Sequence, residues 1–139
     1  MILLDTNVLS ALMRQEPERP VVDWLDRQPW PSVWTTSITI LEIRFGLETL
    51  PLGKRRSYLV ETFEKMLVEK LEQRIAGFDH AAATEAAEVL ANRQKRGYPG
   101  DLRDTMIAGI ALSRGATLVT RNDRHFSNLA LNIVNPWKV

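Results

Sequence analysis

Cysteine is absent from the sequence, and histidine occurs only twice among its 139 residues. The absence of cysteine excludes disulfide bonds, thiolate catalysis and cysteine-ligated metal sites. Two histidines leave little room for a metal site built from imidazole rings. Any metal ion that this chain binds is therefore expected to be held by oxygen atoms.

Long apolar runs and a marked excess of charge are also lacking. No segment approaches the roughly 18 to 20 apolar residues that cross a membrane, and the N-terminus lacks the pattern of a signal peptide. With 18 Lys and Arg against 17 Asp and Glu, bulk charge does not identify a nucleic-acid partner. We expect a cytoplasmic protein with no membrane segment.

The composition that remains is typical of one compact domain, with 45% hydrophobic and 25% charged residues. No repeat or linker divides the chain, so we expect a single domain over residues 1–139. Short β-rich runs alternate with helical patterns. The expected strands lie within 1–5, 32–36, 74–78, 116–120 and 131–136, and the expected helices within 7–14, 21–28, 37–50, 54–71, 79–96 and 102–114.

This alternation predicts an α/β fold, because parallel strands need crossover connections and helices supply them. We expect a mainly parallel sheet with helices on both faces. Local signals mark several helix ends: Ser37 is a candidate N-cap, Asp79 lies near a helix start, and Gly115 stops the helix at 102–114.

Four acidic residues stand where such elements place ligands. Asp5 ends the first strand, and Asp123 lies just past the strand at 116–120. Asp104 begins the apolar stripe of its helix, and Glu42 lies among apolar side chains of another helix. Because ligands of open parallel sheets bind outside the carboxyl ends of the strands, we expect these acids to meet at that edge.

Several carboxylates in one site repel one another unless they are protonated or neutralised. A hard divalent cation neutralises them at neutral pH, and Mg²⁺ and Mn²⁺ both suit oxygen ligands. Such an ion can polarise a phosphate, generate hydroxide from water and stabilise the leaving oxygen. The four acids therefore indicate a hydrolase that cleaves phosphodiester bonds.

Each acid also has a purely structural interpretation. Asp101 and Asp104 are spaced as the first and fourth positions of an N-terminal cap. Asp5, or either of the two residues after it, can cap the helix that follows. Glu42 can pair with a basic residue of another helix, and Asp123 can be an ordinary loop residue. Capping does not require four acids to converge, which favours the metal site.

Three stretches, in the same order along the chain as in a known family, resemble that family. They are MILLDTNVLS at the start, ILEIRFGL at 40–47 and DLRDTMIAGIALSRGATLVTRNDRHF at 101–126. Together they resemble the PIN domain of the VapC toxin family, over residues 1 to about 135. The resemblance implies a three-layer α/β/α sandwich and a Mg²⁺- or Mn²⁺-dependent endoribonuclease that acts as the toxin of a toxin–antitoxin pair.

The resemblance also implies roles for single residues. Asp5 matches the acid of the first strand, Glu42 the acid of the third helix, and Asp104 the acid that precedes Ile-Ala. These three residues would bind metal and orient the attacking water. Thr6 and Asn7 would hold Asp5 and a metal-bound water by hydrogen bonds.

The fourth acidic position departs from the family pattern. Relatives often carry an acid directly before the phenylalanine, where this chain has His125. We assign the catalytic and metal-binding role to Asp123, with Asn122 as an alternative source of an oxygen ligand. Arg121 and Arg124 flank the proposed site and are the candidates for contacts with the RNA backbone.

Similarity to the family further implies a small antitoxin as partner, lying across the active-site groove, and a homodimer. Trp24, Trp30 and Trp34 can supply an apolar surface for association. Buried or half-buried positions in the core are the interpretation that we favour for these tryptophans.

Two other functions compete with the nuclease. A catalytically degenerate module that binds RNA or a protein partner is consistent with His125 at the fourth position. A phosphohydrolase of the haloacid dehalogenase type also places an Asp after its first strand. That chemistry requires a second acid two residues later, where this chain has Asn7.

Overall fold

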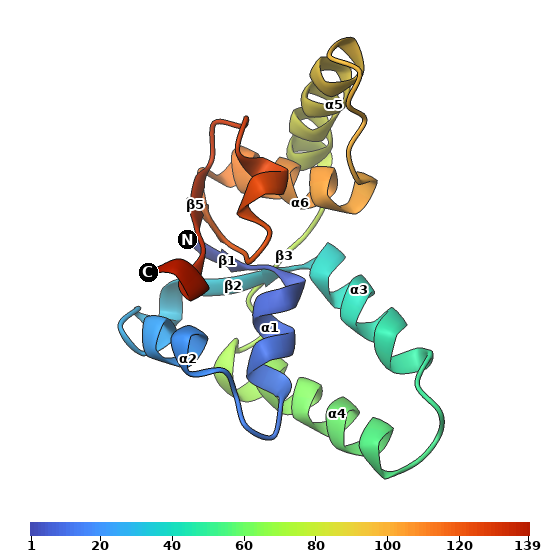
Figure 1. Ribbon diagram of the computed structural model, residues 1–139, viewed down its shortest axis with the longest axis vertical. Helices are drawn as coiled ribbons and strands as arrows, with labels where there is room; N and C mark the ends of the chain where they lie inside the picture. The colour runs from blue at the N-terminus through green and yellow to red at the C-terminus, as the bar shows by residue number, and fades with distance from the viewer.

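Five strands form one sheet through the centre of the molecule. The computed structural model describes residues 1–139. The strands are β1 (Ile2–Leu4), β2 (Val33–Thr36), β3 (Ile75–Ala76), β4 (Thr117–Val119) and β5 (Asn132–Val134). Their order across the sheet is β3-β2-β1-β4-β5, and every neighbouring pair is parallel. The predicted parallel sheet is confirmed, and β1 lies at its centre (Figure 1).

Six α-helices connect and cover these strands. They are α1 (Thr6–Met13), α2 (Arg19–Asp26), α3 (Ser37–Glu48), α4 (Lys54–Lys65), α5 (His80–Lys95) and α6 (Leu102–Arg114). A π-helical turn, η2 (Met66–Lys70), continues α4, and three short 3-10 helices are η1 (Trp30–Ser32), η3 (Asp123–Phe126) and η4 (Pro136–Lys138). None of the helices is long and apolar enough to cross a membrane.

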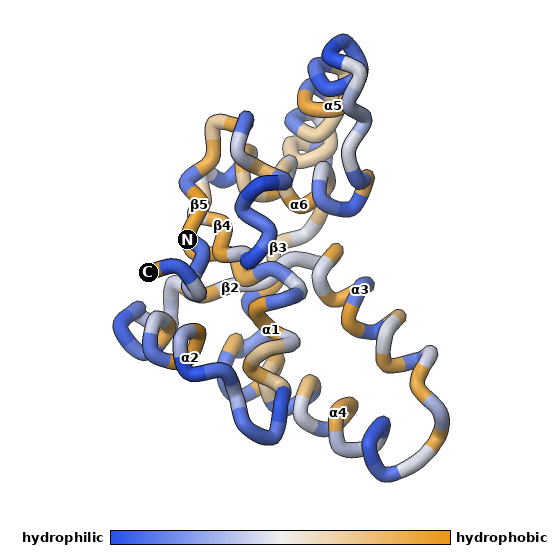
Figure 2. Tube along the Cα trace, in the orientation of Figure 1, coloured by the Kyte–Doolittle hydropathy of each residue, from blue (hydrophilic) through white to orange (hydrophobic).

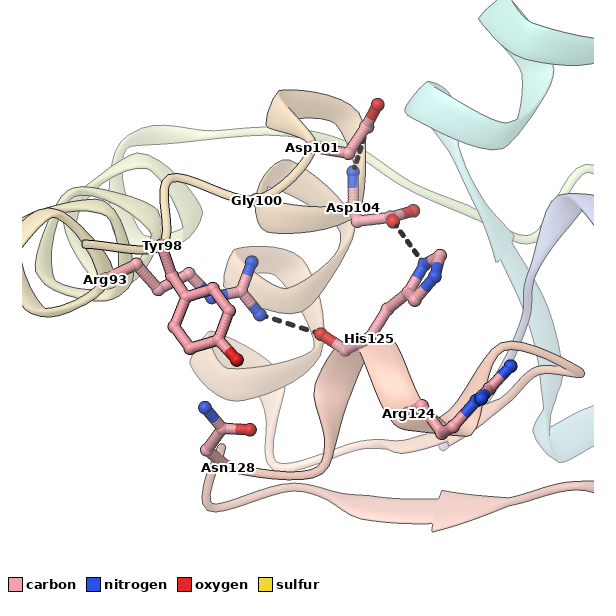
Figure 3. A pocket seen from close by; sticks show the side chains of 8 residues that line it. All are labelled: Arg93, Tyr98, Gly100, Asp101, Asp104, Arg124, His125 and Asn128. Carbon is pink, nitrogen blue, oxygen red and sulfur yellow. Dashed lines mark hydrogen bonds and ion pairs between the residues drawn. The ribbon is translucent and has the colours of Figure 1, made fainter. Parts of the chain in front are cut away.

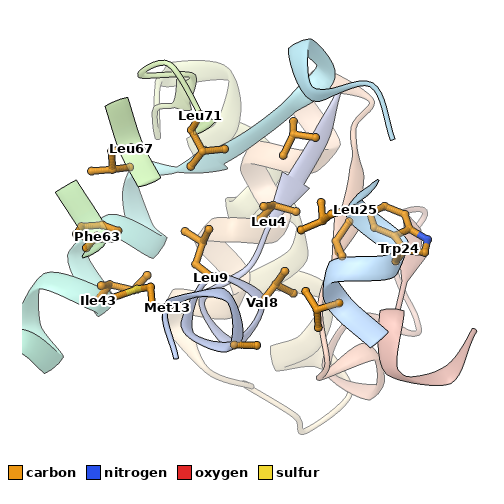
Figure 4. Close-up of a cluster of buried hydrophobic side chains, with 14 of the residues drawn as sticks. Leu4, Val8, Leu9, Met13, Trp24, Leu25, Ile43, Phe63, Leu67 and Leu71 are labelled. Atoms are coloured by element: carbon orange, nitrogen blue, oxygen red, sulfur yellow. The ribbon is translucent and has the colours of Figure 1, made fainter. Parts of the chain in front are cut away.

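Two apolar cores lie on opposite faces of the sheet, because successive side chains of a strand point to opposite faces. Leu4 and Val119 belong to one core, whereas their neighbours Leu3 and Leu118 belong to the other. Helices α1 to α4 contribute to the first core (Figure 4). The helical residues of the second core come mainly from α6, which supplies Ile107, Ala108, Ile110 and Ala111. Apolar residues accordingly concentrate along the strands, while the far end of α5 is hydrophilic (Figure 2). The expected three-layer α/β/α sandwich is confirmed.

Helices α5 and α6 approach each other closely through small side chains. A Cβ atom added to Gly109 of α6 would lie 2.4 Å from the carbonyl oxygen of Ala82 and 2.9 Å from the Cβ atom of Ala86. Only glycine therefore fits at this position. The close approach fixes the packing of α6 against α5, and Asp104 lies in the first turn of α6.

The predicted N-cap of α3 is wrong by one residue. Thr36 is the cap, and its hydroxyl accepts a hydrogen bond from the backbone N–H of Thr39 at 3.0 Å. The Ser37 hydroxyl instead accepts one from the backbone N–H of Phe78 at 3.2 Å. The Ser37 hydroxyl therefore binds a segment 41 residues away, and Thr36 caps the helix in its place.

The three tryptophans of residues 24–34 pack into the two cores. Trp24 is buried, and Trp30 and Trp34 are half-buried. Trp24 and Trp30 pack in the first core and Trp34 against the second. The core interpretation is confirmed, so these rings do not form an open apolar surface.

Candidate active site

The carboxylate of Asp5 is the buried centre of the site. Asp5 follows β1 directly, caps α1, and is 3% exposed. Its Oδ1 accepts a hydrogen bond from the backbone N–H of Thr6 at 2.8 Å, and its Oδ2 accepts one from the Thr120 hydroxyl at 2.7 Å. The Asp5 N–H donates to the carbonyl of Val119 at 3.0 Å. The residue is thus anchored to both α1 and the end of β4.

The environment of Asp5 raises the pKa of its carboxyl group above the ordinary value of 3.8. Burial is the largest cause, because it disfavours the charged form. The hydrogen bonds from Thr120 and Thr6 lower the pKa, and the negative charges of Asp104 and Glu42 raise it. These charge interactions, together with the hydrogen bonds of Thr6 to both Asp5 and Glu42, indicate that three of the four predicted acids lie near one another.

Glu42 reaches the site from the second turn of α3. Its Oε1 accepts a hydrogen bond from the Thr6 hydroxyl at 2.7 Å. Its Oε2 lies 3.7 Å from Nη1 of Arg103, which follows the N-cap of α6 by two residues. Thr6 therefore links Asp5 and Glu42, through its N–H and its hydroxyl. Sequence reasoning anticipated a basic partner for Glu42 on another helix but did not identify Arg103.

Asp101 and Asp104 occupy the first and fourth positions of the N-terminal cap of α6, as their spacing predicts, and the Asp104 carboxylate has a different partner. Asp101 caps α6, with its Oδ1 accepting a hydrogen bond from the N–H of Asp104 at 3.1 Å. The Asp104 carboxylate turns instead to His125, and its Oδ2 lies 2.9 Å from Nδ1 of that ring (Figure 3). In the sequence, His125 stands in the place of the family's fourth acid. The structure places it directly against the third acid.

Asp123 lies apart from the other three acids. Its carboxylate accepts a hydrogen bond from Nζ of Lys138 at 3.1 Å and a longer one from the amide of Asn135 at 3.4 Å. The Lys138 hydrogen bond holds the pKa of Asp123 below its ordinary value. Asp123 and His125 are two residues apart on the 3-10 helix η3, so their side chains point in different directions. Nothing local in the sequence indicates Lys138 as the partner.

The remaining candidates connect the segment after β4 to the rest of the site. The Asn7 side-chain oxygen accepts a hydrogen bond from the N–H of Arg121 at 3.0 Å. Asn122 contributes its backbone N–H, which donates to the Thr120 hydroxyl at 3.0 Å. The Arg121 guanidinium lies 4.7 Å from the ring centre of Trp137. Arg124 lines a pocket that also contains Asp104 and His125.

The donor atoms at this edge suit a hard divalent cation. Asp5, Glu42 and Asp104 offer carboxylate oxygens, and the buried Asp5 carboxylate has only uncharged hydrogen-bond partners. No group of three or more acidic or histidine side chains is close enough to enclose an ion unaided. Mg²⁺ retains several waters and shares its ligands with substrate phosphates, so an open arrangement of carboxylates fits such an ion.

Two helical layers around a parallel sheet, with a buried Asp5 that Thr6 links to Glu42, define an α/β protein with acidic residues after its central strand. Residues 2–132 match the PIN domain, and the chain belongs to that family. The predicted resemblance is confirmed. Membership of this family leaves the haloacid dehalogenase alternative without support.

Relatives match over nearly the full chain. The plasmid stability protein StbB of Pseudomonas syringae pv. tomato is 40% identical over 99% of both chains. The VapC ribonuclease Y4jK of Sinorhizobium fredii is 36% identical over 99% of both. The toxin FitB of Neisseria gonorrhoeae is 34% identical, again over 99% of both. The chain therefore has VapC-type toxins among its relatives.

Solved structures show the same fold. The FitAcB structure from Neisseria gonorrhoeae contains a chain with a TM-score of 0.89 and 33% identity, covering 100% of both chains. The DNA-bound VapBC structure from Salmonella typhimurium contains one with a TM-score of 0.77 and 28% identity, covering 97% of both. The architecture is thus that of the toxin subunit type found in these complexes.

Proposed function

We propose that the chain is a Mg²⁺- or Mn²⁺-dependent endoribonuclease and the toxin of a toxin–antitoxin pair. The observation that carries the proposal is the buried carboxylate of Asp5, whose pKa is raised by burial and by Glu42 and Asp104. Three carboxylates held in this way favour a cation among them. Full-length relatives named as a VapC ribonuclease and a toxin support RNA as the substrate.

In this proposal Asp5, Glu42 and Asp104 hold the ion, and the other residues position them. The Thr6 and Thr120 hydrogen bonds orient Glu42 and Asp5. His125 occupies one oxygen of Asp104, and the other oxygen remains for the ion. A bound divalent ion supplies charge that polarises a phosphodiester and acidifies water. Asp123, whose carboxylate is paired with Lys138, is the fourth acid of the proposed site.

The basic residues around the site favour a phosphate-bearing substrate. Arg103 lies beside Glu42, and Arg124 lies next to His125 on the other side of Asp104. Arg121 packs on Trp137 of the 3-10 helix η4. Guanidinium groups on two sides of an acidic centre can bind the phosphates that flank the one being cleaved.

The proposed partners are a small antitoxin protein and a second copy of the chain. The kinship with a toxin, FitB, supports the antitoxin. Co-expression with the open reading frame beside the gene tests it, because a stable complex should copurify and lose nuclease activity. A light-scattering mass of one chain for the purified protein would contradict the homodimer.

Incubation of purified protein with a mixed cellular RNA pool tests the nuclease itself. Cleavage should require Mg²⁺ or Mn²⁺, stop with EDTA, and disappear in Asp5→Asn and Asp104→Asn. Asp23→Asn, a change of the same kind on an exposed acid of α2, should cleave like the wild type. Wild-type protein that is folded, free of antitoxin and inactive with either metal would favour the degenerate binding module.

A further inference from the structure

A polar pocket of about 260 Å³ lies beside Asp104, and neither Asp5 nor Glu42 lines it. Asp104 and His125 form its wall toward the acidic site, and the opposite wall comes from the end of α5 and the loop that joins it to α6 (Figure 3). The proposed catalytic residues use only the Asp104–His125 wall. The remaining side chains therefore call for a separate explanation.

Arg93 holds the pocket in shape. One of its terminal nitrogens donates a hydrogen bond to the Thr105 hydroxyl at 3.1 Å, and the other donates to the backbone carbonyl of His125 at 2.8 Å. A single guanidinium thus ties α5 to the first turn of α6 and to η3. These hydrogen bonds fix the relative positions of α5, α6 and η3 around the pocket.

The loop between α5 and α6 is shaped to cover Arg93. Gly97 and Gly100 both have positive φ angles, +76° and +68°, which favour glycine. A Cβ atom on Gly100 would lie 2.6 Å from Nη1 of Arg93. The N–H of Tyr98 donates to the carbonyl of Arg93 at 2.9 Å. The loop therefore presents Tyr98 at the rim of the pocket.

The lining offers an aromatic face and the amide of Asn128, whose oxygen accepts a hydrogen bond from the Ser127 hydroxyl at 3.3 Å. The Tyr98 residue is 65% exposed although its ring lies against a built pocket. Asn128 points toward Tyr98 from the segment after η3 (Figure 3). Exposed aromatic rings stack on unpaired bases, and amides form hydrogen bonds with base edges. Arg124 in the same lining can bind the adjoining phosphate.

We propose that this pocket is a nucleobase subsite, which receives the base of a nucleotide next to the cleaved phosphodiester, stacked on Tyr98 and contacted at its edge by Asn128. The inference rests on the proposed ribonuclease function and narrows its substrate. A base can enter the pocket only when it is unpaired and unstacked from its neighbours. The substrate class is therefore single-stranded RNA or a loop of a folded RNA.

Binding of two fluorescent oligomers in EDTA tests the subsite without cleavage. One is an oligouridylate, and the other is a ribose-phosphate oligomer of equal length and charge that lacks bases. The wild type should bind the first about 5-fold or more tightly than the second, because stacking of a base contributes roughly 1 kcal/mol or more. Tyr98→Ala should lose this preference, and Tyr98→Phe should keep it. Tyr58→Ala, which truncates the other tyrosine, should also keep it.

The outcomes separate this subsite from the nuclease. Equal binding of both oligomers by the wild type, or an undiminished preference in Tyr98→Ala, would overturn the subsite. RNA cleavage with metal would still support the nuclease in that case. A base preference that depends on Tyr98, in a protein that cleaves no RNA, would support the subsite and remove the nuclease.

Discussion

Thr6 and Thr120 hold the buried Asp5 carboxylate from two directions, and each of these threonines has a second hydrogen bond. The Thr6 hydroxyl donates to Glu42, and the Thr120 hydroxyl accepts from the N–H of Asn122. The buried Asp5 carboxylate thus has only uncharged hydrogen-bond partners, which position it without neutralising it. Two predictions at the scale of single residues concern Asp5 and Thr6.

Asp5→Asn should raise the melting temperature of the metal-free protein at pH 7. Because the folded state raises the pKa of Asp5, it retains the proton above the unfolded value near 3.8. Unfolding free energy therefore falls as pH rises from that value through the folded pKa, and the ionised group costs stability at neutral pH. In a domain of this size about 1 kcal/mol corresponds to roughly 4 °C.

Calorimetric or circular-dichroism melts from pH 4 to 8 check this expectation. The difference between Asp5→Asn and wild type should shrink toward pH 4. Added Mg²⁺ should raise the melting temperature of the wild type and leave the variant unchanged, because a ligand stabilises only the state that binds it. A variant that melts below the wild type at pH 7 would contradict the effect assigned to the buried charge.

Thr6→Val should lower the rate of RNA cleavage about 10- to 100-fold, the usual effect of removing a group that orients a metal ligand. The substitution preserves shape but leaves Glu42 with Arg103 as its remaining polar partner. Thr6→Ser keeps the hydroxyl and should retain most activity. Steady-state cleavage and Mn²⁺ affinity should change together in Thr6→Val. Unchanged values in both measurements would show that the Thr6 hydroxyl does not position Glu42.

At the scale of whole elements, α6 carries much of the site. Its N-terminal turn supplies Asp104 and Arg103, its start is capped by Asp101, and its end is closed by Gly115 in a left-handed conformation. Gly109 allows α5 to approach closely. The position of α6 against α5 therefore controls where the third acid meets His125.

Gly109→Ala should destabilise the protein by about 1 to 3 kcal/mol, because the added methyl group overlaps the backbone of α5. Gly46→Ala is the matched control, since no atom lies within 4 Å of a Cβ atom at that helical position. That control should stabilise α3 by roughly 0.5 to 1 kcal/mol. Urea unfolding measures both changes. Equal stability of the two variants would argue against the close α5–α6 contact.

Elements with local signals were predictable from the sequence, and contacts between distant elements were not. Asp101 and Gly115 carry their own capping geometry, so the bounds of α6 were predicted correctly. Ser37 was misassigned because its competing partner, Phe78, is 41 residues away. Three acids could be placed from strand ends and helix faces. The partner of Asp104, His125, depended on how η3 packs against α6.

For the molecule as a whole, the near-zero net charge conceals an uneven distribution of acidic and basic residues. Net charge is only +1, yet Arg103 lies beside Glu42 and Arg124 lines the pocket that contains Asp104. In the proposed nuclease, such arginines would contact the RNA backbone beside the acids. Salt should therefore weaken RNA binding even though the protein is nearly neutral.

Replacing Arg121 and Arg124 together with Ala should weaken RNA binding and flatten its salt dependence. Two lost phosphate contacts would reduce the slope of log K against log salt by about 1.4 for a single strand. Arg19 and Arg27 of the α2 region, replaced in the same way, serve as the control. Anisotropy titrations in EDTA at several salt concentrations give the slopes. An unchanged slope would show that neither arginine contacts the backbone.

The hydrogen bond between Asp5 and Thr120 joins residues that are 115 positions apart in the chain. Asp5 is among the first residues to leave the ribosome, whereas β4, which aligns the central strand on one side, follows more than 100 residues later. A nascent or truncated chain that ends before Thr117 contains all three clustered acids but cannot assemble them. The hydrogen-bond partner of Asp5 is therefore made only near the end of synthesis, so the proposed nuclease site would be complete only in a nearly full-length chain.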